Sequence, residues 1–327
     1  MPPAGANPRG FRVKALVTGA AGFIGSHLTT ALLDRGAEVT GIDSFTDYYP
    51  RAIKESNVAV NAGRVGFHFV EASLQGTHLP ALLAGKTHVF HLAAQAGVRK
   101  SWGRDFRIYT EQNVNATQRL LEACVSLSLD RFVYASSSSV YGDGVSIPMR
   151  EDAPLHPVSP YGVTKLAAEQ LCYLYWFNYG VPTTSLRYFT VYGPRQRPDM
   201  AFHRFVKAAL RDEPITLYGD GEQTRDFTYV LDAIAATIAA AGHGVPGHVY
   251  NVGGGSRVSI NQVLRKLEEI TNKKLNIARQ PTQKGDMRDT YADTTRARTE
   301  LGFAPRVTLD QGLEAEYQWL STALALR

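Results

Sequence analysis

Residues 18–25 read Thr-Gly-Ala-Ala-Gly-Phe-Ile-Gly, between a short apolar run at Val13–Val17 and a helical pattern at Phe23–Asp34. Glycines at this spacing permit a tight turn, let the backbone approach a pyrophosphate, and let the helix pack closely on the strand. The amino end of the following helix attracts the anion. A strand, a glycine-rich turn and a helix in this order therefore predict a dinucleotide-binding site.

An acidic residue, Asp43, closes the second apolar run, 18 residues after Gly25. A carboxylate at this place accepts hydrogen bonds from the ribose hydroxyls of an adenosine and repels a 2′-phosphate. Ser44 and Phe45 follow it, so no adjacent arginine favours the phosphorylated cofactor. The sequence predicts that the cofactor is NAD rather than NADP.

Short apolar runs alternate with amphipathic stretches through the first 190 residues. The expected strands are Val13–Val17, Glu38–Ile42, Phe67–Val70, His88–Leu92, Arg131–Ala135 and Thr183–Leu186, and the longest expected helices are Phe23–Asp34, Phe106–Val125 and Tyr161–Tyr179. This alternation predicts an α/β fold: a Rossmann-type, doubly wound parallel sheet with a smaller α/β substrate lobe at the C-terminus. We expect the NAD-binding Rossmann domain at 10–190, with 230–255 returning to it, and the substrate-binding lobe at 191–229 and 256–327.

The composition is that of a globular protein, since 44% of the 327 residues are hydrophobic and 20% are charged. No apolar run approaches the roughly 20 residues of a membrane span, and residues 1–10 lack the apolar core of a secretory signal. Cys124 and Cys172 lie in different helical patterns, which argues against a disulfide framework and suits a reducing compartment. We expect a cytoplasmic protein with no membrane partner.

The net charge of +5 is concentrated in one segment. Between Arg187 and Arg211, six basic residues stand against Asp199 alone, which also nets +5. A nucleic-acid-binding protein more often carries a longer basic stripe interleaved with aromatic residues, so we expect no nucleic acid partner. A solvated helix face and a site for an anionic ligand are both consistent with this segment.

Tyr161 and Lys165 are spaced i, i+4, so both project from one face of one helix. The run Ser136–Ser139 follows an expected strand, at the strand end where ligands bind in open α/β sheets. A tyrosine with an ordinary pKa of about 10 is a poor base at neutral pH, but a nearby lysine ammonium and a cationic nicotinamide favour the phenolate. A serine hydroxyl beside it can hold a substrate oxygen and relay its proton. The alternative is a partly buried core tyrosine with a surface lysine.

Several stretches together resemble the extended short-chain dehydrogenase/reductases. They are the glycine motif, Asp43, HLAAQAGVR at His91–Arg99, SSSSVYG at Ser136–Gly142, Tyr161-x-x-x-Lys165 and LRYFTVYGPR at Leu186–Arg195. Within that family the chain most resembles nucleotide-sugar 4-epimerases, and among these the UDP-glucuronic acid 4-epimerases. The finer likeness rests on Asp47-Tyr48-Tyr49 and Arg197-Pro198-Asp199-Met200.

The resemblance implies an isomerase that converts UDP-glucuronic acid to UDP-galacturonic acid through a transient 4-keto sugar, with tightly held NAD. It implies three catalytic residues. Tyr161 removes the proton of the sugar C4 hydroxyl, Ser137 shares the hydrogen bond to that hydroxyl, and Lys165 is the ammonium beside Tyr161. The residues implied to bind NAD are Gly19, Gly22, Phe23, Ile24, Gly25, Asp43, Ser44, Leu92, Ala93, Ala94, Tyr161 and Lys165.

A 4-keto uronic acid is a β-keto acid, so an epimerase must hold its carboxylate away from alignment with the carbonyl π system. A guanidinium fork suits a carboxylate, and Arg197 aligns with the arginine that resembling enzymes use. The alternative is a loop arginine paired with Asp199. Arg225 and Arg288 have family precedent for the diphosphate, although each could instead pair with its neighbouring aspartate. The implied substrate-binding residues are Arg99, Ser137, Ser138, Ser139, Tyr161, Thr190, Arg197, Arg225 and Arg288.

Two departures from the family pattern concern specificity. Many relatives place an acid after the third strand to meet the adenine amino group, where this chain has Glu71-Ala72-Ser73. Uronate epimerases commonly show Trp-Gly before the motif arginine, where this chain has Arg195-Gln196. Arg195 is therefore a second candidate for the carboxylate.

Serine at both 138 and 139 argues against a dehydratase and against a decarboxylase. Dehydratases of the family usually carry Asp-Glu in place of Ser138-Ser139, and sugar-acid decarboxylases usually carry Glu at the second position. The alternatives that remain are a UDP-glucose or UDP-N-acetylglucosamine 4-epimerase, then a UDP-glucuronate decarboxylase, then a catalytically silent NAD-binding sensor. No cluster has metal-ligand spacing, and His91 is expected to be a packed residue. Since relatives dimerise through the helices expected at 106–125 and 161–179, we expect a homodimer.

Overall fold

Seven parallel strands form the central sheet of the computed structural model, which describes residues 13–325. The strand order is β11-β6-β5-β4-β1-β2-β3, and every hydrogen-bonded pair is parallel. The strands are β1 (Lys14–Thr18), β2 (Glu38–Asp43), β3 (Phe67–Glu71), β4 (His88–His91), β5 (Arg131–Ser137), β6 (Thr183–Tyr188) and β11 (Val249–Val252). The order reverses between β1 and β4, which is where ligands bind in such sheets. Residues 1–10, examined for a signal, and residues 10–12, expected to begin the Rossmann domain, lie outside the described residues, as do 326–327.

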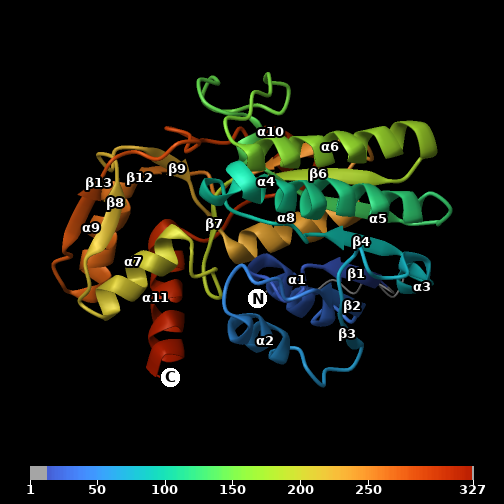
Figure 1. Ribbon diagram of the computed structural model, residues 1–327, viewed down its shortest axis with the longest axis horizontal. Coiled ribbons are helices and arrows are strands. Elements are labelled where there is room, and N and C mark those ends of the chain that lie inside the picture. The colour runs from blue at the N-terminus through green and yellow to red at the C-terminus, as the bar shows by residue number, and fades with distance from the viewer. Residues whose placement is uncertain (1–12, 326–327) are drawn as a thin grey trace.

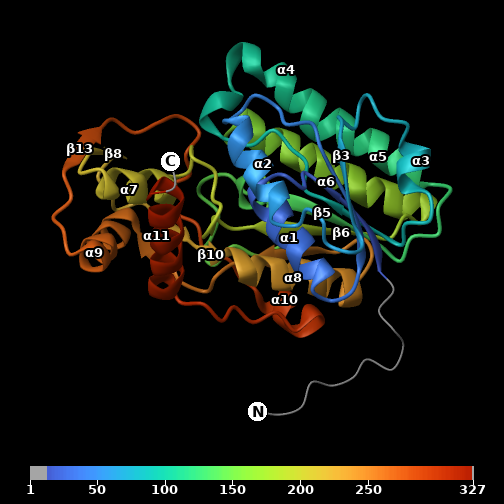
Figure 2. The same ribbon diagram turned by 90° about the horizontal axis from the view of Figure 1, so that it is seen from below.

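Helices cover both faces of this sheet (Figure 2). One face carries α3 (Leu79–Leu83), α4 (Phe106–Tyr109), α5 (Ala116–Cys124) and α6 (Pro160–Tyr179). The other carries α1 (Phe23–Leu33), α8 (Val230–His243) and α10 (Thr295–Leu301), with α2 (Arg51–Ala59) against α1. Strands buried on both faces read as near-continuous apolar runs, and the predicted Rossmann-type α/β fold is confirmed.

The single helix expected at 106–125 is interrupted by a π-helical segment, Thr110–Asn115. Its wider turn brings the buried Asn113 amide onto the Gln95 backbone, accepting from its N–H at 2.7 Å and donating to its carbonyl at 3.0 Å. Asn113 also donates to Thr164 of α6 at 3.0 Å. The sequence carries no signal for this change in helix type, since residues 110–115 contain neither proline nor glycine.

A second group of elements lies to one side of the sheet (Figure 1). There α7 (Ala201–Leu210), α9 (Ile260–Thr271) and α11 (Leu309–Ala325) pack on one another. Three two-stranded pairs accompany them: β7 (Val191–Tyr192) with β10 (Thr228–Tyr229), β8 (Ile215–Tyr218) with β13 (Ile277–Gln280), and β9 (Thr224–Asp226) with β12 (Arg257–Ser259). The expected boundaries place α10 in the lobe, and its main contacts are with α8 and β11 at the central sheet.

Cys124 and Cys172 are free, buried thiols on α5 and α6. No helix within residues 13–325 is long and apolar enough to cross a membrane. Over the same range, no three His, Cys, Asp or Glu side chains group in a way that could hold a metal ion.

Candidate active site

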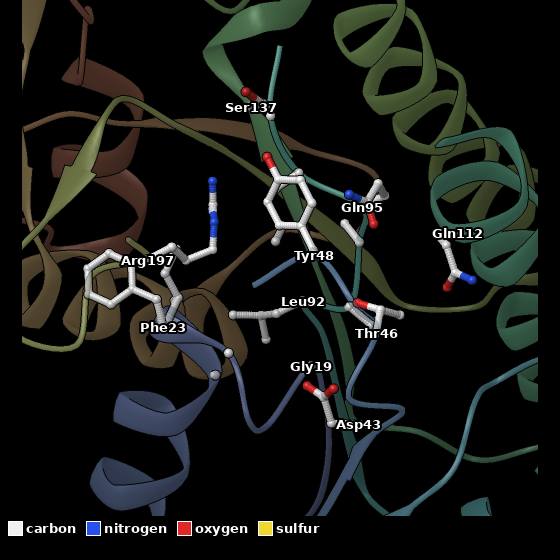
Figure 3. A pocket seen from close by; sticks show the side chains of 18 of the residues that line it. Gly19, Phe23, Asp43, Thr46, Tyr48, Leu92, Gln95, Gln112, Ser137 and Arg197 are labelled. Atoms are coloured by element: carbon white, nitrogen blue, oxygen red, sulfur yellow. The ribbon is translucent and has the colours of Figure 1, made fainter. Parts of the chain in front are cut away.

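A cavity of about 410 Å³ opens at the carboxyl ends of the central strands, at the reversal between β1 and β4 (Figure 3). This volume is in the range of small-molecule sites. All the residues that the sequence assigned to the cofactor line it: Gly19, Gly22, Phe23, Ile24, Gly25, Asp43, Ser44, Leu92, Ala93, Ala94, Tyr161 and Lys165. Ser137, Ser138, Ser139, Thr190 and Arg197 of the expected substrate set line it as well.

The glycine turn leaves no room for side chains. Gly19 has a φ of +72°, and a Cβ there would lie 2.9 Å from the backbone nitrogen of Ala93. A Cβ on Gly25 would overlap the carbonyl oxygen of Gly19. Gly22 caps α1 without a side-chain hydrogen bond, so the first N–H groups of the helix are available to a ligand. This cradle fits the pyrophosphate of a dinucleotide.

Asp43 lies at the floor of the cavity below this turn (Figure 3). Its Oδ1 accepts from the N–H of Phe45 at 2.9 Å, and its Oδ2 accepts from the N–H of Ala21 at 3.2 Å. Burial raises the pKa of Asp43, while these N–H groups and the Lys54 cation oppose the rise. The remaining lone pairs of the carboxylate suit the hydroxyls of a ribose.

The end of the third strand lacks an acid that faces the cavity. Glu71 is turned onto Arg51 in a bidentate pair, with N–O distances of 2.8 and 2.7 Å. Ala72 and Ser73 line the cavity in its place.

Tyr161 and Lys165 lie one turn apart at the start of α6. Ser159 caps this helix, its Oγ accepting from the N–H of Gly162 at 3.1 Å. Burial raises the pKa of Tyr161, and the Ser137 hydroxyl and the charge of Arg197 oppose that rise. Ser137 Oγ accepts from the N–H of Ser139 at 3.1 Å, so its own proton is free to be donated toward the tyrosine or a ligand.

The side chain of Lys165 is buried. Its Nζ lies 4.5 Å from the centre of the Tyr134 ring, and burial lowers the pKa of Lys165 to about 7. The expected effect of the Lys165 ammonium on Tyr161 stays a prediction.

Arg197 is the arginine of its segment that reaches the cavity (Figure 3). Its Nε and Nη2 each lie 3.0 Å from an oxygen of Asp199. Arg195, the other candidate, has a φ of +65° and donates from Nη1 to Ser26 Oγ at 3.4 Å, against α1. The loop thus sends the two arginines in different directions. Arg197 forms the ion pair with Asp199 that was the alternative, and it also lines the cavity, so its binding of a carboxylate stays a prediction.

A smaller cavity of about 160 Å³ shares Val98, Ser138, Ser139 and Thr190 with the first. Arg225 lines it, and its guanidinium donates to the carbonyl oxygens of Thr224, Met287 and Arg288 at 2.5–2.8 Å. The alternative pairing of Arg225 with Asp226 does not occur. The Asp226 carboxylate instead accepts three backbone N–H groups, those of Gly254, Gly255 and Ala292.

Two of the expected substrate residues line neither cavity. Arg99 pairs with Asp286 at 2.7 Å, and its guanidinium carbon lies 4.2 Å from the centre of the Tyr218 ring. Arg288 is 66% exposed and approaches Asp220 and Asp289 at 3.9 and 4.0 Å. Their part in substrate binding stays a prediction.

His91 is a packed residue, as expected. Its two ring nitrogens hydrogen-bond Thr18 at 2.7 Å and Thr117 at 2.9 Å, and its side chain is fully buried. Burial, with the Lys165 charge, lowers the pKa of His91 to about 3, so the ring is neutral.

Several cavity residues received no role from the sequence. They are Thr46, Tyr48, Tyr49, Lys54, Gln95, Gln112 and Met200. Tyr48 and Tyr49 belong to a stretch already noted for its likeness to uronate epimerases, so a signal was present. Lys54 carried no such signal, because nothing local distinguishes it from a solvated helix lysine.

Comparison with known proteins identifies the family of the chain. Residues 15–253 match the family model described as "NAD dependent epimerase/dehydratase family". The chain is 44% identical over 312 residues to the Bacillus subtilis (strain 168) protein named "Uncharacterized UDP-glucose epimerase YtcB", covering 95% of this chain and 98% of that protein. It is 37% identical to a protein of Thermodesulfobacterium geofontis (strain OPF15) named UDP-glucuronate 4-epimerase, over 93% of this chain and 95% of that one.

Solved structures give the same result. The crystal structure of a UDP-glucuronic acid 4-epimerase from Bacillus cereus, in complex with UDP-glucuronic acid and NAD, superposes with a TM-score of 0.93. That chain is 46% identical in sequence, and the match covers 95% of this chain and 100% of that chain.

Proposed function

The chain belongs to the NAD dependent epimerase/dehydratase family, and on that basis we propose that it is an NAD-dependent isomerase that interconverts UDP-glucuronic acid and UDP-galacturonic acid. The observation that carries the choice of sugar is Arg197, a guanidinium that lines the same cavity as Tyr161 and Ser137. A fixed arginine beside the reacting centre suits a sugar that bears a carboxylate. The similar Bacillus cereus protein is a UDP-glucuronic acid 4-epimerase and was solved with UDP-glucuronic acid bound, which supports the same substrate here.

NAD fits the larger cavity. The glycine turn and the uncapped start of α1 would hold the pyrophosphate, and Asp43 would accept hydrogen bonds from the adenosine ribose. When bound, NAD accepts a hydride from C4 of the sugar and returns it to the opposite face, so the reaction is redox-neutral.

Tyr161 acts as the base of the reaction. In its phenolate form, Tyr161 takes the proton of the C4 hydroxyl, and the Ser137 hydroxyl donates a hydrogen bond to the same C4 oxygen. Burial raises the pKa of Tyr161, and the positive charge of Arg197, like the Ser137 hydroxyl, lowers it. When the sugar has turned over in the cavity, the tyrosine returns the proton to the C4 oxygen of the epimer. Lys165, one turn after Tyr161 on α6, is the third catalytic residue, and its ammonium favours the phenolate form of Tyr161.

Arg197 binds the carboxylate, with Ser138 and Ser139 as neighbouring hydroxyls in the same cavity. This contact keeps the C5–C6 bond of the 4-keto intermediate away from the carbonyl π system and so protects it from losing CO₂. Neither serine can act as the acid that elimination of water needs. The diphosphate is assigned to Arg225 in the adjoining cavity, with Arg99 and Arg288 beside it, and the lobe at 191–229 and 256–327, without α10, covers the nucleotide.

Product analysis by proton NMR tests the proposal. The purified protein is mixed with UDP-glucuronic acid without added NAD, and UDP-galacturonic acid with no pentose product is the expected result. A pentose product would mean a decarboxylase. Turnover of UDP-glucose but not of UDP-glucuronic acid would make the protein a neutral-sugar epimerase, and bound NAD without any turnover would make it a sensor.

We further propose that two copies of the chain form a homodimer through α4 and α6. These helices expose large apolar side chains that one chain does not cover: Phe106, Ile108, Val163, Tyr173, Leu174, Phe177 and Tyr179. Light scattering at micromolar concentration is expected to give twice the chain mass of 35.9 kDa. Phe177→Asp should produce a monomer, whereas the matched change Val65→Asp, at a fully exposed turn, should not. We also infer a cytoplasmic location, which suits the two free thiols.

A further inference from the structure

The guanidinium of Arg197 is held by only one of its edges. Nε and Nη2 form a fork on the two oxygens of Asp199, with both distances 3.0 Å. Within residues 13–325, Nη1 makes no hydrogen bond. A guanidinium has five N–H donors in fixed directions, so the Nη1 edge and the second proton of Nη2 are available to another anion. In Figure 3 the head of the side chain points into the cavity, toward the end where Ser137 lies.

Asp199 is itself held from a distant part of the chain. The hydroxyl of Tyr48, on the loop after β2, donates to Asp199 Oδ2 at 3.2 Å. The ring of Tyr48 lies 5.8 Å from the guanidinium carbon of Arg197, and the Lys100 ammonium lies 5.0 Å from the same ring. The carboxylate is thereby fixed between an arginine of its own loop and a tyrosine across the cavity.

This group is partly sheltered from water, with the side chains of Arg197 and Asp199 only 20% and 32% exposed. Burial disfavours the arginine cation, but the charge and hydrogen bonds of Asp199 outweigh it and raise the pKa of Arg197. Burial likewise opposes the Asp199 anion, and Arg197 and Tyr48 outweigh that effect and lower the pKa of Asp199. Both groups are therefore charged when a ligand arrives.

We propose that Asp199 and Tyr48 are positioning residues that determine the preference for a uronate, because they hold Arg197 with its free edge presented to the sugar. The proposal rests on the proposed function and extends it to residues that do not themselves touch the reacting atoms. A long arginine side chain loses rotamer freedom when it binds. The pair with Asp199 fixes the Arg197 rotamer before the substrate arrives, so the carboxylate of the sugar meets a preorganised pair of donors.

The same arrangement protects the intermediate. In the 4-keto uronate, loss of CO₂ breaks the C5–C6 bond, and its electron pair moves into a C4–C5 enolate. A proton from water then adds at C5, which leaves a 4-keto pentose. This path opens when the carboxylate turns so that the C5–C6 bond aligns with the carbonyl π system. An arginine free to swing would let the carboxylate turn, so loosening Arg197 should raise the yield of pentose.

The test uses Asp199→Asn, which keeps the shape of the side chain and removes its charge, and Tyr48→Phe. Asp152→Asn is the matched control, since Asp152 forks onto Arg150 at the same two-residue spacing, with distances of 3.0 and 3.1 Å, on the exposed surface. We expect Asp199→Asn to raise KM for UDP-glucuronic acid at least about tenfold, equivalent to about 1.4 kcal/mol, with a smaller change in kcat. Tyr48→Phe should raise KM less than Asp199→Asn does. Asp199→Glu, which keeps the charge, should raise KM less than Asp199→Asn as well. The pentose fraction should rise with Asp199→Asn and not with Asp152→Asn.

Calorimetric binding to the NAD-loaded protein supplies a readout that does not depend on turnover. Wild-type protein should bind UDP-glucuronic acid more tightly than UDP-glucose, and Asp199→Asn should remove that preference while leaving the affinity for UDP unchanged. An equal loss of affinity for all three ligands would assign Asp199 a structural role and overturn the proposal. Unchanged preference and no pentose would overturn it as well. A preference that depends on Asp199, in a protein that converts neither sugar, would support the positioning role and refute the proposed function.

Discussion

Arg187 and Glu169 form an ion pair in the interior of the protein. Nη2 of the arginine lies 2.6 Å from Oε1 and Nε lies 3.1 Å from Oε2, and the two side chains are 3% and 1% exposed. Ser136 donates to the same Oε2 at 2.5 Å. The pair therefore ties β6 to α6 and to the end of β5, where Ser137 begins the active site.

Removing one partner of this pair should destabilise the protein strongly. Glu169→Gln leaves the Arg187 cation buried without a counter-charge, so we expect the free energy of unfolding to fall by about 3–5 kcal/mol. Denaturant titration measures this. The double variant Glu169→Leu with Arg187→Met removes both charges and should lose less than the sum of the single changes. A loss below about 1 kcal/mol for Glu169→Gln is what an exposed ion pair gives, and it would contradict the stabilising role of the buried pair.

Tyr161→Phe removes the base and leaves the packing of the ring in place. We expect kcat to fall by about 10²–10⁴-fold, the range for loss of a general acid–base group. The amount of NAD released on denaturation should match wild type, because phenylalanine keeps the ring that lines the cavity and the glycine turn that holds the pyrophosphate is unchanged. Tyr317→Phe, which removes a hydroxyl on α11 in the lobe, is the control and should keep wild-type activity. Retention of kcat in Tyr161→Phe would assign the base elsewhere.

Gly25→Ala tests the cradle for the pyrophosphate. The new methyl group would overlap the carbonyl oxygen of Gly19, so the turn must shift and the purified protein should carry little or no NAD. Gly242→Ala on α8 is matched in chemistry, and its Cβ would meet nothing within 4 Å. We expect that control to keep its NAD and to gain up to about 1 kcal/mol of stability, since alanine is favoured over glycine in a helix. Absorbance and chromatography of the released nucleotide separate the two outcomes.

His91 should make stability depend on pH in the acidic range. Burial lowers its pKa from 6.5 to about 3 in the folded state, so between these values the unfolded chain binds the extra proton. The free energy of unfolding therefore falls as the pH falls from 6.5 toward 3, by at most about 1.4 kcal/mol per pH unit.

The comparison with His91→Gln isolates this contribution from those of the other histidines. Between pH 7 and pH 5, we expect wild type to lose about 2 kcal/mol more than His91→Gln does. Denaturant titrations of both proteins at the two pH values measure the difference. Parallel losses would mean that His91 is protonated in the folded protein.

The site divides into features that short spacings reveal and features that they do not. The glycine turn, Asp43 and the Tyr161–Lys165 pair could be predicted because each depends on residues close in the chain, or on a regular alternation of strands and helices. The π-helical segment at Thr110–Asn115 could not, because the hydrogen bonds that Asn113 makes there are with the distant backbone of Gln95. The burial of Lys165 against the ring of Tyr134 could not either, since it depends on how α6 packs on the sheet.

The sequence by itself determined the α/β fold, the glycine turn before the first helix and the place of Tyr161 and Lys165 on one face of a helix, because local hydrophobic periodicity and glycine geometry are properties of neighbouring residues. The tertiary structure alone decided that Arg197, and not Arg195, enters the cavity. It alone brought Tyr48 to Asp199, 151 residues away in the chain. Such contacts arise only when the lobe folds against the sheet, because hydrogen bonds and ion pairs act over a few ångströms in space, whatever the separation along the chain.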